Sequence, residues 1–187
     1  SINSIKNIGT KAWVKEGGLL SIWILGMFNA ADATTIVIPF AKGDEAKLGP
    51  VVNDTYFGKV PAERLVIKDG VMYFAADAGY RGKIGVPPRR AKSMLGSYDA
   101  LNKVLTIVQF TLPKGATGYV NSMWEIQKDP YSGDVLNSYN DGPLEDGSQM
   151  GPFYELEDSS PAVALKAGES TNNITLTPAS GTIDGAA

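Results

Sequence analysis

Two glutamates near the carboxyl end have the spacing that proton chemistry needs. Glu155 and Glu157 lie two residues apart in the segment Phe153–Glu157. On a strand they share one face, while Tyr154 and Leu156 point the other way. Two carboxylates within about 7 Å of each other raise each other's proton affinity, which favours a general base or a pair of hydroxyl acceptors. The alternative is an ordinary solvent-facing side of a strand opposite basic residues.

A polar cluster precedes these glutamates, and it has the residue types that bind sugars. It contains Asn137, Ser138, Tyr139, Asn140 and Asp141, directly before Gly142-Pro143, and a second polar loop follows at 145–149. Planar amides and carboxylates bind pairs of hydroxyls, while an aromatic ring covers the apolar face of a sugar. The aromatic candidates are Trp124, Tyr131, Tyr139 and Tyr154. The alternatives are turn formers that bond their own backbone and aromatic residues of the core.

The composition excludes several classes of chemistry. The 187 residues contain no cysteine and no histidine. Disulfides, thiolate metal sites, a thiol nucleophile, a Ser-His-Asp triad and imidazole metal ligands are therefore excluded within this chain. Carboxylates, lysine and tyrosine remain for proton transfer. The net charge of −3 gives no general attraction to nucleic acid, so none is expected as a partner.

Charge is divided between two blocks. Bases without acids occupy residues 78–98, and acids without bases occupy residues 129–158. The blocks are either neighbouring loops that partly neutralise each other, or the acidic block is one wall of a polyol or cation site. Among the basic residues of the first block, Arg81 is a candidate ligand-binding residue. No cofactor and no metal ligand set is expected; calcium at 141–147 is a minor alternative, because the acid spacing does not match an EF-hand.

The segments that must position these residues have a strand pattern. We expect strands at 34–40, 65–67, 71–74, 104–111, 119–127, 153–157, 162–165 and 172–177. Asp69-Gly70 between two apolar runs predicts a hairpin, because both central residues of its turn need positive φ. Short helices are expected only near Ala46 or at 90–95. The prediction is an all-β sandwich or barrel forming one domain, with a loose tail at 178–187.

No membrane span is expected. The most apolar run, Leu19–Phe28, is shorter than the roughly 20 residues that cross a bilayer, and it lacks the features of a signal peptide. Because the chain opens at Ser1, we expect a processed or partial chain. The compartment is not fixed by the sequence, with a periplasmic or extracellular location as the working hypothesis.

Several motifs resemble a known group of proteins. The early motifs are Leu20–Phe28, Arg81–Gly85, Gly96–Asp99 and Tyr119–Glu125. The late motifs are Tyr139–Pro143, Met150–Glu157, Ser160-Pro161 and Leu165–Ser170. Together they resemble the C-terminal part of a group of uncharacterised bacterial proteins, which is similar to the galactose mutarotase-like (aldose 1-epimerase) superfamily.

This resemblance implies a fold and a chemistry. The fold is an antiparallel β supersandwich, here the C-terminal portion of a domain, that binds a pyranose in a concave cleft. The general base is a late-strand glutamate in an apolar-Glu context before a Gly-Glu turn. Leu156-Glu157 before Gly168-Glu169 matches that context, so Glu157 is the implied base, with Glu155 if the register differs. Because this chain lacks the superfamily's histidines, the acid would be a lysine, arginine or tyrosine, or would come from another polypeptide segment.

Three hypotheses follow. The first is a carbohydrate-binding and carbohydrate-active protein with Glu157 or Glu155 as base. A glycosidase version needs two carboxylates about 5–10 Å apart, which Glu125 on the 119–127 strand would supply by facing Glu157. The second is a non-catalytic sugar-binding or structural β module with Trp124 as platform. The third is self-association through open sheet edges of a partial sandwich.

Overall fold

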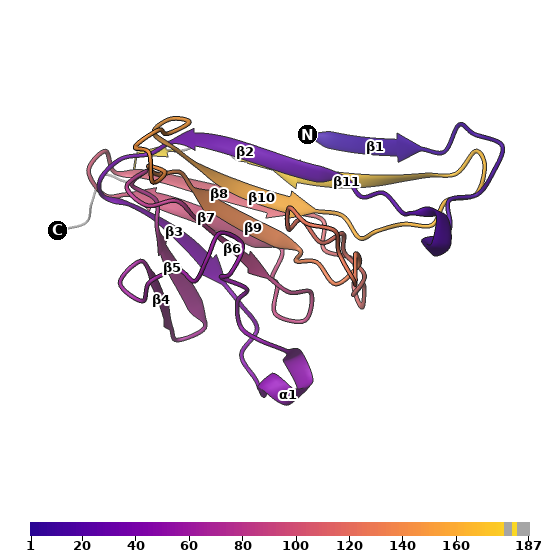
Figure 1. Ribbon diagram of the computed structural model, residues 1–187, viewed down its shortest axis with the longest axis horizontal. Helices are drawn as coiled ribbons and strands as arrows, with labels where there is room; N and C mark the ends of the chain where they lie inside the picture. The colour runs from indigo at the N-terminus through magenta and orange to yellow at the C-terminus, as the bar shows by residue number, and fades with distance from the viewer. Residues whose placement is uncertain (178–180, 183–187) are drawn as a thin grey trace.

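The computed structural model describes residues 1–177 and 181–182. They form two antiparallel sheets (Figure 1). The smaller sheet has the order β2 (Trp23–Asn29), β10 (Phe153–Ser159), β9 (Leu136–Asn140) and β6 (Gly82–Val86). The two short helical segments are a 3-10 turn at Lys15–Gly17 and α1 (Glu45–Leu48).

The larger sheet has eight strands. Its order is β1 (Ile2–Lys6), β11 (Ser170–Leu176), β8 (Val104–Phe110), β7 (Met94–Asp99), β3 (Thr34–Pro39), β5 (Val71–Ala75) and β4 (Leu65–Lys68), with β12 (Gly181–Thr182) pairing β8 beside this path. The all-β prediction is confirmed.

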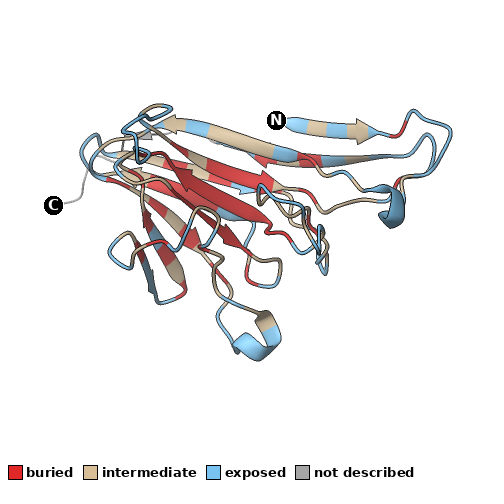
Figure 2. Ribbon diagram, viewed as in Figure 1, coloured by how far each residue is buried: buried red, intermediate tan, exposed pale blue. Residues whose placement is uncertain are grey.

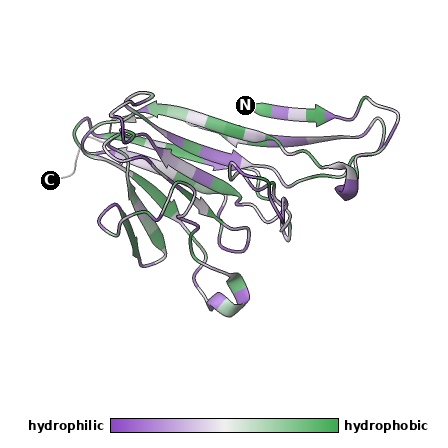
Figure 3. Cartoon of the chain, viewed as in Figure 1, coloured by the Kyte–Doolittle hydropathy of each residue, from purple (hydrophilic) through white to green (hydrophobic). Residues whose placement is uncertain are grey.

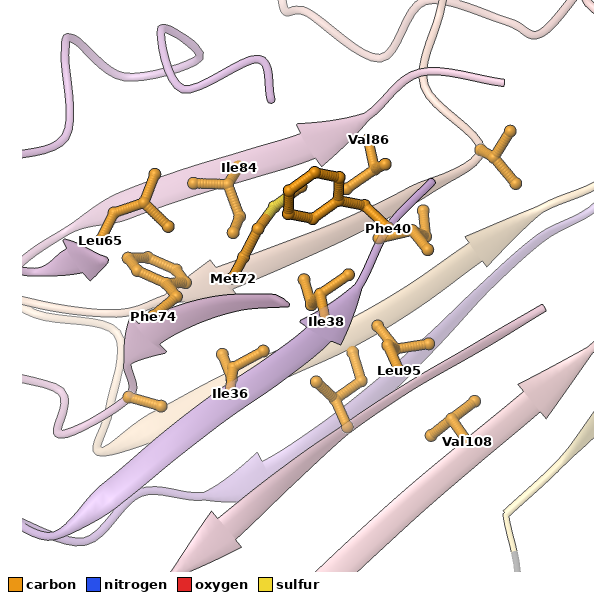
Figure 4. Close-up of a cluster of buried hydrophobic side chains, with 14 of the residues drawn as sticks. Ile36, Ile38, Phe40, Leu65, Met72, Phe74, Ile84, Val86, Leu95 and Val108 are labelled. Carbon is orange, nitrogen blue, oxygen red and sulfur yellow. The ribbon is translucent and has the colours of Figure 1, made fainter. Parts of the chain in front are cut away.

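The core lies between the two sheets. Ile36 and Ile38 of β3 and Phe74 of β5 are fully buried, and they meet Ile84 of β6 from the smaller sheet (Figure 4). The strands of this layer contribute alternate residues to it, because successive side chains point to opposite faces. β6 and β9 are buried along their whole length, so both of their faces are covered (Figure 2).

Most predicted strands are confirmed. The runs at 34–40, 104–111, 153–157 and 172–177 form β3, β8, β10 and β11. The hairpin at Asp69-Gly70 joins β4 to β5, and both turn residues have positive φ, 54° and 85°. The helix near Ala46 is α1, which Asp44 caps by accepting a hydrogen bond from the Ala46 N–H.

Other predictions were wrong. Residues 119–127 form a loop instead of a strand, because Asn121 accepts a hydrogen bond from the Met123 N–H and so turns the chain. Residues 162–165 contribute one isolated bridge, between Leu20 and Val163. No helix forms at 90–95, where a turn leads into β7. The expected polar loop at 137–141 is mainly the buried strand β9. Residues 178–180 and 183–187 of the predicted tail lie outside the described residues.

Candidate functional site

The outer face of the smaller sheet carries the candidate site. Because side chains alternate, Glu155 and Glu157 of β10 point to this face, while Tyr154 and Leu156 enter the core, as predicted. The pairing places Glu155 opposite Met27 of β2 and Tyr139 of β9. Tyr139 is in turn opposite Lys83 of β6. One row across the four strands therefore combines a carboxylate, a phenol, an ammonium group and a thioether.

Two loops rise above this face and turn it into a cleft. Phe57, from the segment between α1 and β4, packs edge-on against Tyr139 with ring centroids 5.8 Å apart. Trp124, from the 119–127 loop, packs edge-on against Phe57 at 6.3 Å. The Arg81 guanidinium lies 4.0 Å from the centre of the Phe57 ring, close enough for a cation–π contact. The loops thus add aromatic walls to a floor built by strands.

The resulting cleft has a volume of about 220 Å³. This is smaller than the roughly 300–1,000 Å³ of pockets for drug-sized ligands, so it fits a ligand of about one ring. Hydrophobic residues extend along β2, which forms one side (Figure 3). Most of the lining is aromatic or apolar, and a few polar groups project into it. The lining residues are Trp23, Leu25, Met27, Tyr56, Phe57, Arg81, Lys83, Ser122, Trp124, Tyr139, Met150, Phe153 and Glu155.

Glu157 lies beneath the cleft, where a cation neutralises it. The Lys83 ammonium is 2.9 Å from each carboxylate oxygen of Glu157. The Trp23 indole N–H donates a hydrogen bond of 2.8 Å to the same carboxylate. Glu157 is only 1% exposed, so removing Lys83 would leave an uncompensated buried charge. Through these contacts Glu157 orients Lys83 and Trp23 in the cleft.

Glu155 lines the cleft itself. Burial, and next the negative charge of Glu157, raise the pKa of the Glu155 carboxyl to about 7. A carboxyl with such a pKa is partly protonated and partly ionised near neutral pH, which is the range in which a general base or acid works best. Of the two paired glutamates, Glu155 is therefore the one placed to exchange a proton with a ligand.

A second buried carboxylate supports the opposite wall. The Tyr56 hydroxyl donates a hydrogen bond of 2.6 Å to Asp134, which also accepts a 3.4 Å bond from the Asn53 amide. Burial raises the pKa of Asp134 to about 6. Burial, together with the Asp134 charge, also raises the pKa of the Tyr56 phenol. Tyr56 is thereby kept neutral, with its hydroxyl proton committed to Asp134 and its lone pairs able to accept from a ligand.

Tyr139 is fixed in a similar way at the other end of the floor. Its hydroxyl donates a 2.6 Å hydrogen bond to Asp141 and accepts a 3.3 Å bond from Arg81 Nε. Burial, and next Asp141, raise the pKa of Tyr139 to about 12. The second oxygen of Asp141 accepts from the Gly151 N–H at 2.9 Å. This network locks the position of the tyrosine ring relative to the arginine.

A comparison with protein families gives one match. The profile of DUF6786, a family of unknown function, matches residues 1–178. The chain belongs to DUF6786. No curated protein and no solved structure matches this DUF6786 chain.

The structure brings most of the predicted site residues together in this DUF6786 chain. Glu155, Tyr139, Trp124 and Arg81 line the cleft. Three others lie directly behind the lining, where they are buried: Glu157, Asp141 and Asn137, whose amide donates to the Ile84 carbonyl at 3.2 Å.

Two predicted site residues lie elsewhere. Asn140 points to the opposite face of β9, where its amide donates to the Tyr80 carbonyl at 2.9 Å and accepts from the Ala78 N–H at 2.9 Å. Glu125 is exposed in the 119–127 loop and does not line the cleft. The glycosidase arrangement of Glu125 facing Glu157 was therefore wrong, because Glu157 is buried against Lys83. Two aromatic candidates also lie outside it: Tyr154 is in the core, and the Tyr131 hydroxyl accepts from the Leu19 N–H.

Sequence reasoning missed several cleft residues. Trp23 lies in the apolar run that we considered as a possible membrane span and as a motif of the family resemblance, but not as part of a site. Its alternation with Leu25 and Met27 was the available signal. Lys83 belonged to the basic block and to the motif Arg81–Gly85, but it was not predicted as a site residue. Tyr56 and Phe57 form an aromatic pair in a segment with no strand pattern, so nothing local marked them.

Two further observations concern the described part of the chain. Among residues 1–177 and 181–182, no three Asp or Glu side chains gather closely enough to hold a metal ion. Within the same residues, no helix has the length and apolar character needed to cross a bilayer.

Proposed function

We propose that this protein binds a saccharide in the cleft on the outer face of the smaller sheet. The observation that carries the proposal is the combination of aromatic walls with a small set of fixed polar groups on the floor. Sugars have apolar ring faces and polar edges, so their sites pair aromatic surfaces with directed hydrogen bonds. The resemblance of the late motifs to the mutarotase-like superfamily supports the same ligand class.

The polar groups in the cleft match a neutral polyol. Lys83 is neutralised by Glu157, so it contributes donors without a strong net charge. Glu155 and Tyr56 offer acceptors to hydroxyl groups. The Ser122 hydroxyl is buried in the cleft lining and has no hydrogen-bond partner among the described residues.

A second candidate function is catalysis of anomer interconversion, in which a base removes the proton of the anomeric hydroxyl and an acid protonates the ring oxygen. The observation that favours it is the Glu155 carboxyl, whose pKa of about 7 suits a general base for an anomeric hydroxyl. Such a reaction also needs an acid at the ring oxygen. Lys83 is the cationic donor nearest to this base along the strand row, and its pairing with Glu157 fixes its direction.

Titration with a panel of hexoses tests the binding proposal. We expect at least one monosaccharide to bind with heat that calorimetry detects, and Trp124→Ala to weaken its binding by about tenfold or more, because a stacking wall is lost. Ile126→Ala is the matched control: Ile126 is fully exposed in the same loop and does not line the cleft, so its variant should bind as the parent does.

The catalytic candidate has its own control. Glu155→Gln should abolish any acceleration of anomer interconversion seen by polarimetry, while Glu125→Gln should leave it unchanged, because Glu125 lies outside the cleft. Absence of binding across the panel would overturn the binding proposal. Binding without acceleration over buffer would leave binding in place and reject the catalytic candidate.

A further inference from the structure

A second hollow adjoins the cleft. It has a volume of about 240 Å³ and is built largely by the loop between β9 and β10. Arg81 and Met150 line both this hollow and the cleft, so these two residues lie between the hollows. The remaining lining residues are Asp141, Gly142, Leu144, Ser148 and Gln149.

Arg81 stands at the junction with donors to spare. Its Nε atom donates to the Tyr139 hydroxyl, and its guanidinium face rests on Phe57. Its terminal nitrogens make no hydrogen bond and no ion pair within the described part of the chain. A guanidinium held by one edge and one face presents its remaining N–H groups in a fixed direction. Those groups are available to oxygens of a ligand that passes from one hollow to the other.

The loop that forms the second hollow is held by residues that also support the cleft. Asp141 bonds both Tyr139 and Gly151, as described above. Gly142 packs so closely on the segment that leads into β6 that a Cβ atom there would lie 2.3 Å from the Arg81 backbone nitrogen. The Gln149 amide donates to the Ala78 carbonyl at 2.9 Å, which ties the far end of the loop to the same segment. The second hollow is therefore preformed relative to the first.

The chemistry of this hollow resembles that of the cleft more than that of an anion site. Arg81 and Asp141 are the charged residues of its lining and have opposite formal charges, so the lining carries no net formal charge. Leu144 and Met150 supply apolar surface and are 46% and 70% exposed. Ser148 and Gln149 supply hydrogen-bonding groups at the rim. Apolar surface with neutral polar groups again fits the faces and edges of a sugar ring.

We propose that the ligand is at least a disaccharide, with one sugar unit in the cleft, the next in the hollow of the β9–β10 loop, and Arg81 contacting oxygens near the linkage. This inference rests on the proposed saccharide binding and names its substrate class. It assigns Arg81 to both sugar units, and Ser148 and Gln149 to the second unit alone.

Calorimetric titration with a monosaccharide and with neutral disaccharides containing it tests this inference. We expect at least one disaccharide to bind about tenfold tighter than its monosaccharide, and Ser148→Phe, which fills the second hollow, to remove that advantage without changing monosaccharide affinity. Ser93→Phe is the matched control, because Ser93 is exposed near the start of β7 on the other sheet, and it should preserve the advantage.

The outcomes separate the two proposals. Monosaccharide binding with no disaccharide gaining more than about twofold would overturn the two-unit ligand and leave the proposed function intact. A disaccharide advantage that survives Ser148→Phe would also overturn it, because the second unit would then lie elsewhere. Binding of neither ligand would overturn both. Circular dichroism of each variant checks that the fold is retained.

Discussion

Asp134 and Glu157 are both buried carboxylates beneath the cleft, but their partners differ in kind. Glu157 is paired with the Lys83 ammonium. Asp134 accepts its hydrogen bonds from the neutral groups of Tyr56 and Asn53, and burial raises its pKa to about 6. Hydrogen bonds from neutral partners offset only part of the desolvation cost of the Asp134 carboxylate, so its pKa stays raised.

This difference predicts a pH dependence of stability. Because the pKa of Asp134 rises from 3.8 to about 6 on folding, the folded state binds its proton more tightly, and the free energy of unfolding falls as pH rises between these values. Two pH units correspond to about 3 kcal/mol. The amide oxygen of Asp134→Asn can still accept the hydrogen bond from Tyr56, but the amide does not titrate. The free energy of unfolding of this variant relative to the parent should therefore increase by up to about 3 kcal/mol between pH 4 and pH 7. Urea unfolding at several pH values measures it.

The comparison of Asp134→Asn with the parent separates the titration of Asp134 from that of the other groups. Glu155 also has a raised pKa, so the parent alone shows a composite profile. The informative quantity is the difference in unfolding free energy between variant and parent at each pH. Asp129→Asn, at an exposed aspartate of the preceding loop, should show a flat difference. A flat difference for Asp134→Asn as well would mean that Asp134 does not titrate as described.

At the scale of elements, the closeness of β6 to the residues behind the cleft depends on Gly85. A Cβ atom at Gly85 would lie 2.0 Å from an Asp134 carboxylate oxygen and 2.6 Å from the Asn137 amide nitrogen. Both neighbours are buried, and both are held by hydrogen bonds. The glycine therefore permits two polar side chains to pack directly against the strand backbone.

Gly85→Ala should displace this arrangement. We expect a loss of about 1–3 kcal/mol or more in unfolding free energy, as for other overpacked interiors, together with weaker saccharide binding, because Asp134 positions Tyr56. Gly118→Ala is the matched control, since a Cβ atom there meets no atom within 4 Å. Chemical denaturation and calorimetry follow the two effects. Equal stability of the two variants would contradict the close packing at Gly85.

The same strands show how far sequence carries the prediction. β3, β5 and β8 were predictable, because β-branched runs and an Asp-Gly turn are local signals. β9 was not, because its polar residues are buried only through partners far along the chain: Asn137 bonds the Ile84 carbonyl, and Asn140 bonds Tyr80. Alternation correctly placed Glu155 and Glu157 on one face. It could not show that Lys83 would bury one of them and leave the other in the cleft.

At the scale of the whole molecule, the candidate site draws on distant parts of the chain. β2 and β10, which pair in the smaller sheet, are separated by more than a hundred residues, and the loops that form the walls come from between them. β9 is preceded by the loop that carries Trp124 and followed by the loop that carries Ser148, so these loops lie beyond opposite ends of the strand (Figure 1). A ligand across both hollows would therefore connect loops that the fold otherwise holds apart.

Hydrogen exchange tests this arrangement across the molecule. At a disaccharide concentration of about 100 times its Kd, binding stabilises the folded state by about 2.7 kcal/mol. Because both loops would contact the ligand, amides at 121–127 and at 144–149 should exchange more slowly together, while the turn at Asp69-Gly70 on the other sheet should be unaffected. With a monosaccharide, only the first loop should respond. Protection of the second loop by a monosaccharide, or of neither loop by a disaccharide, would show that the two hollows do not act as one site.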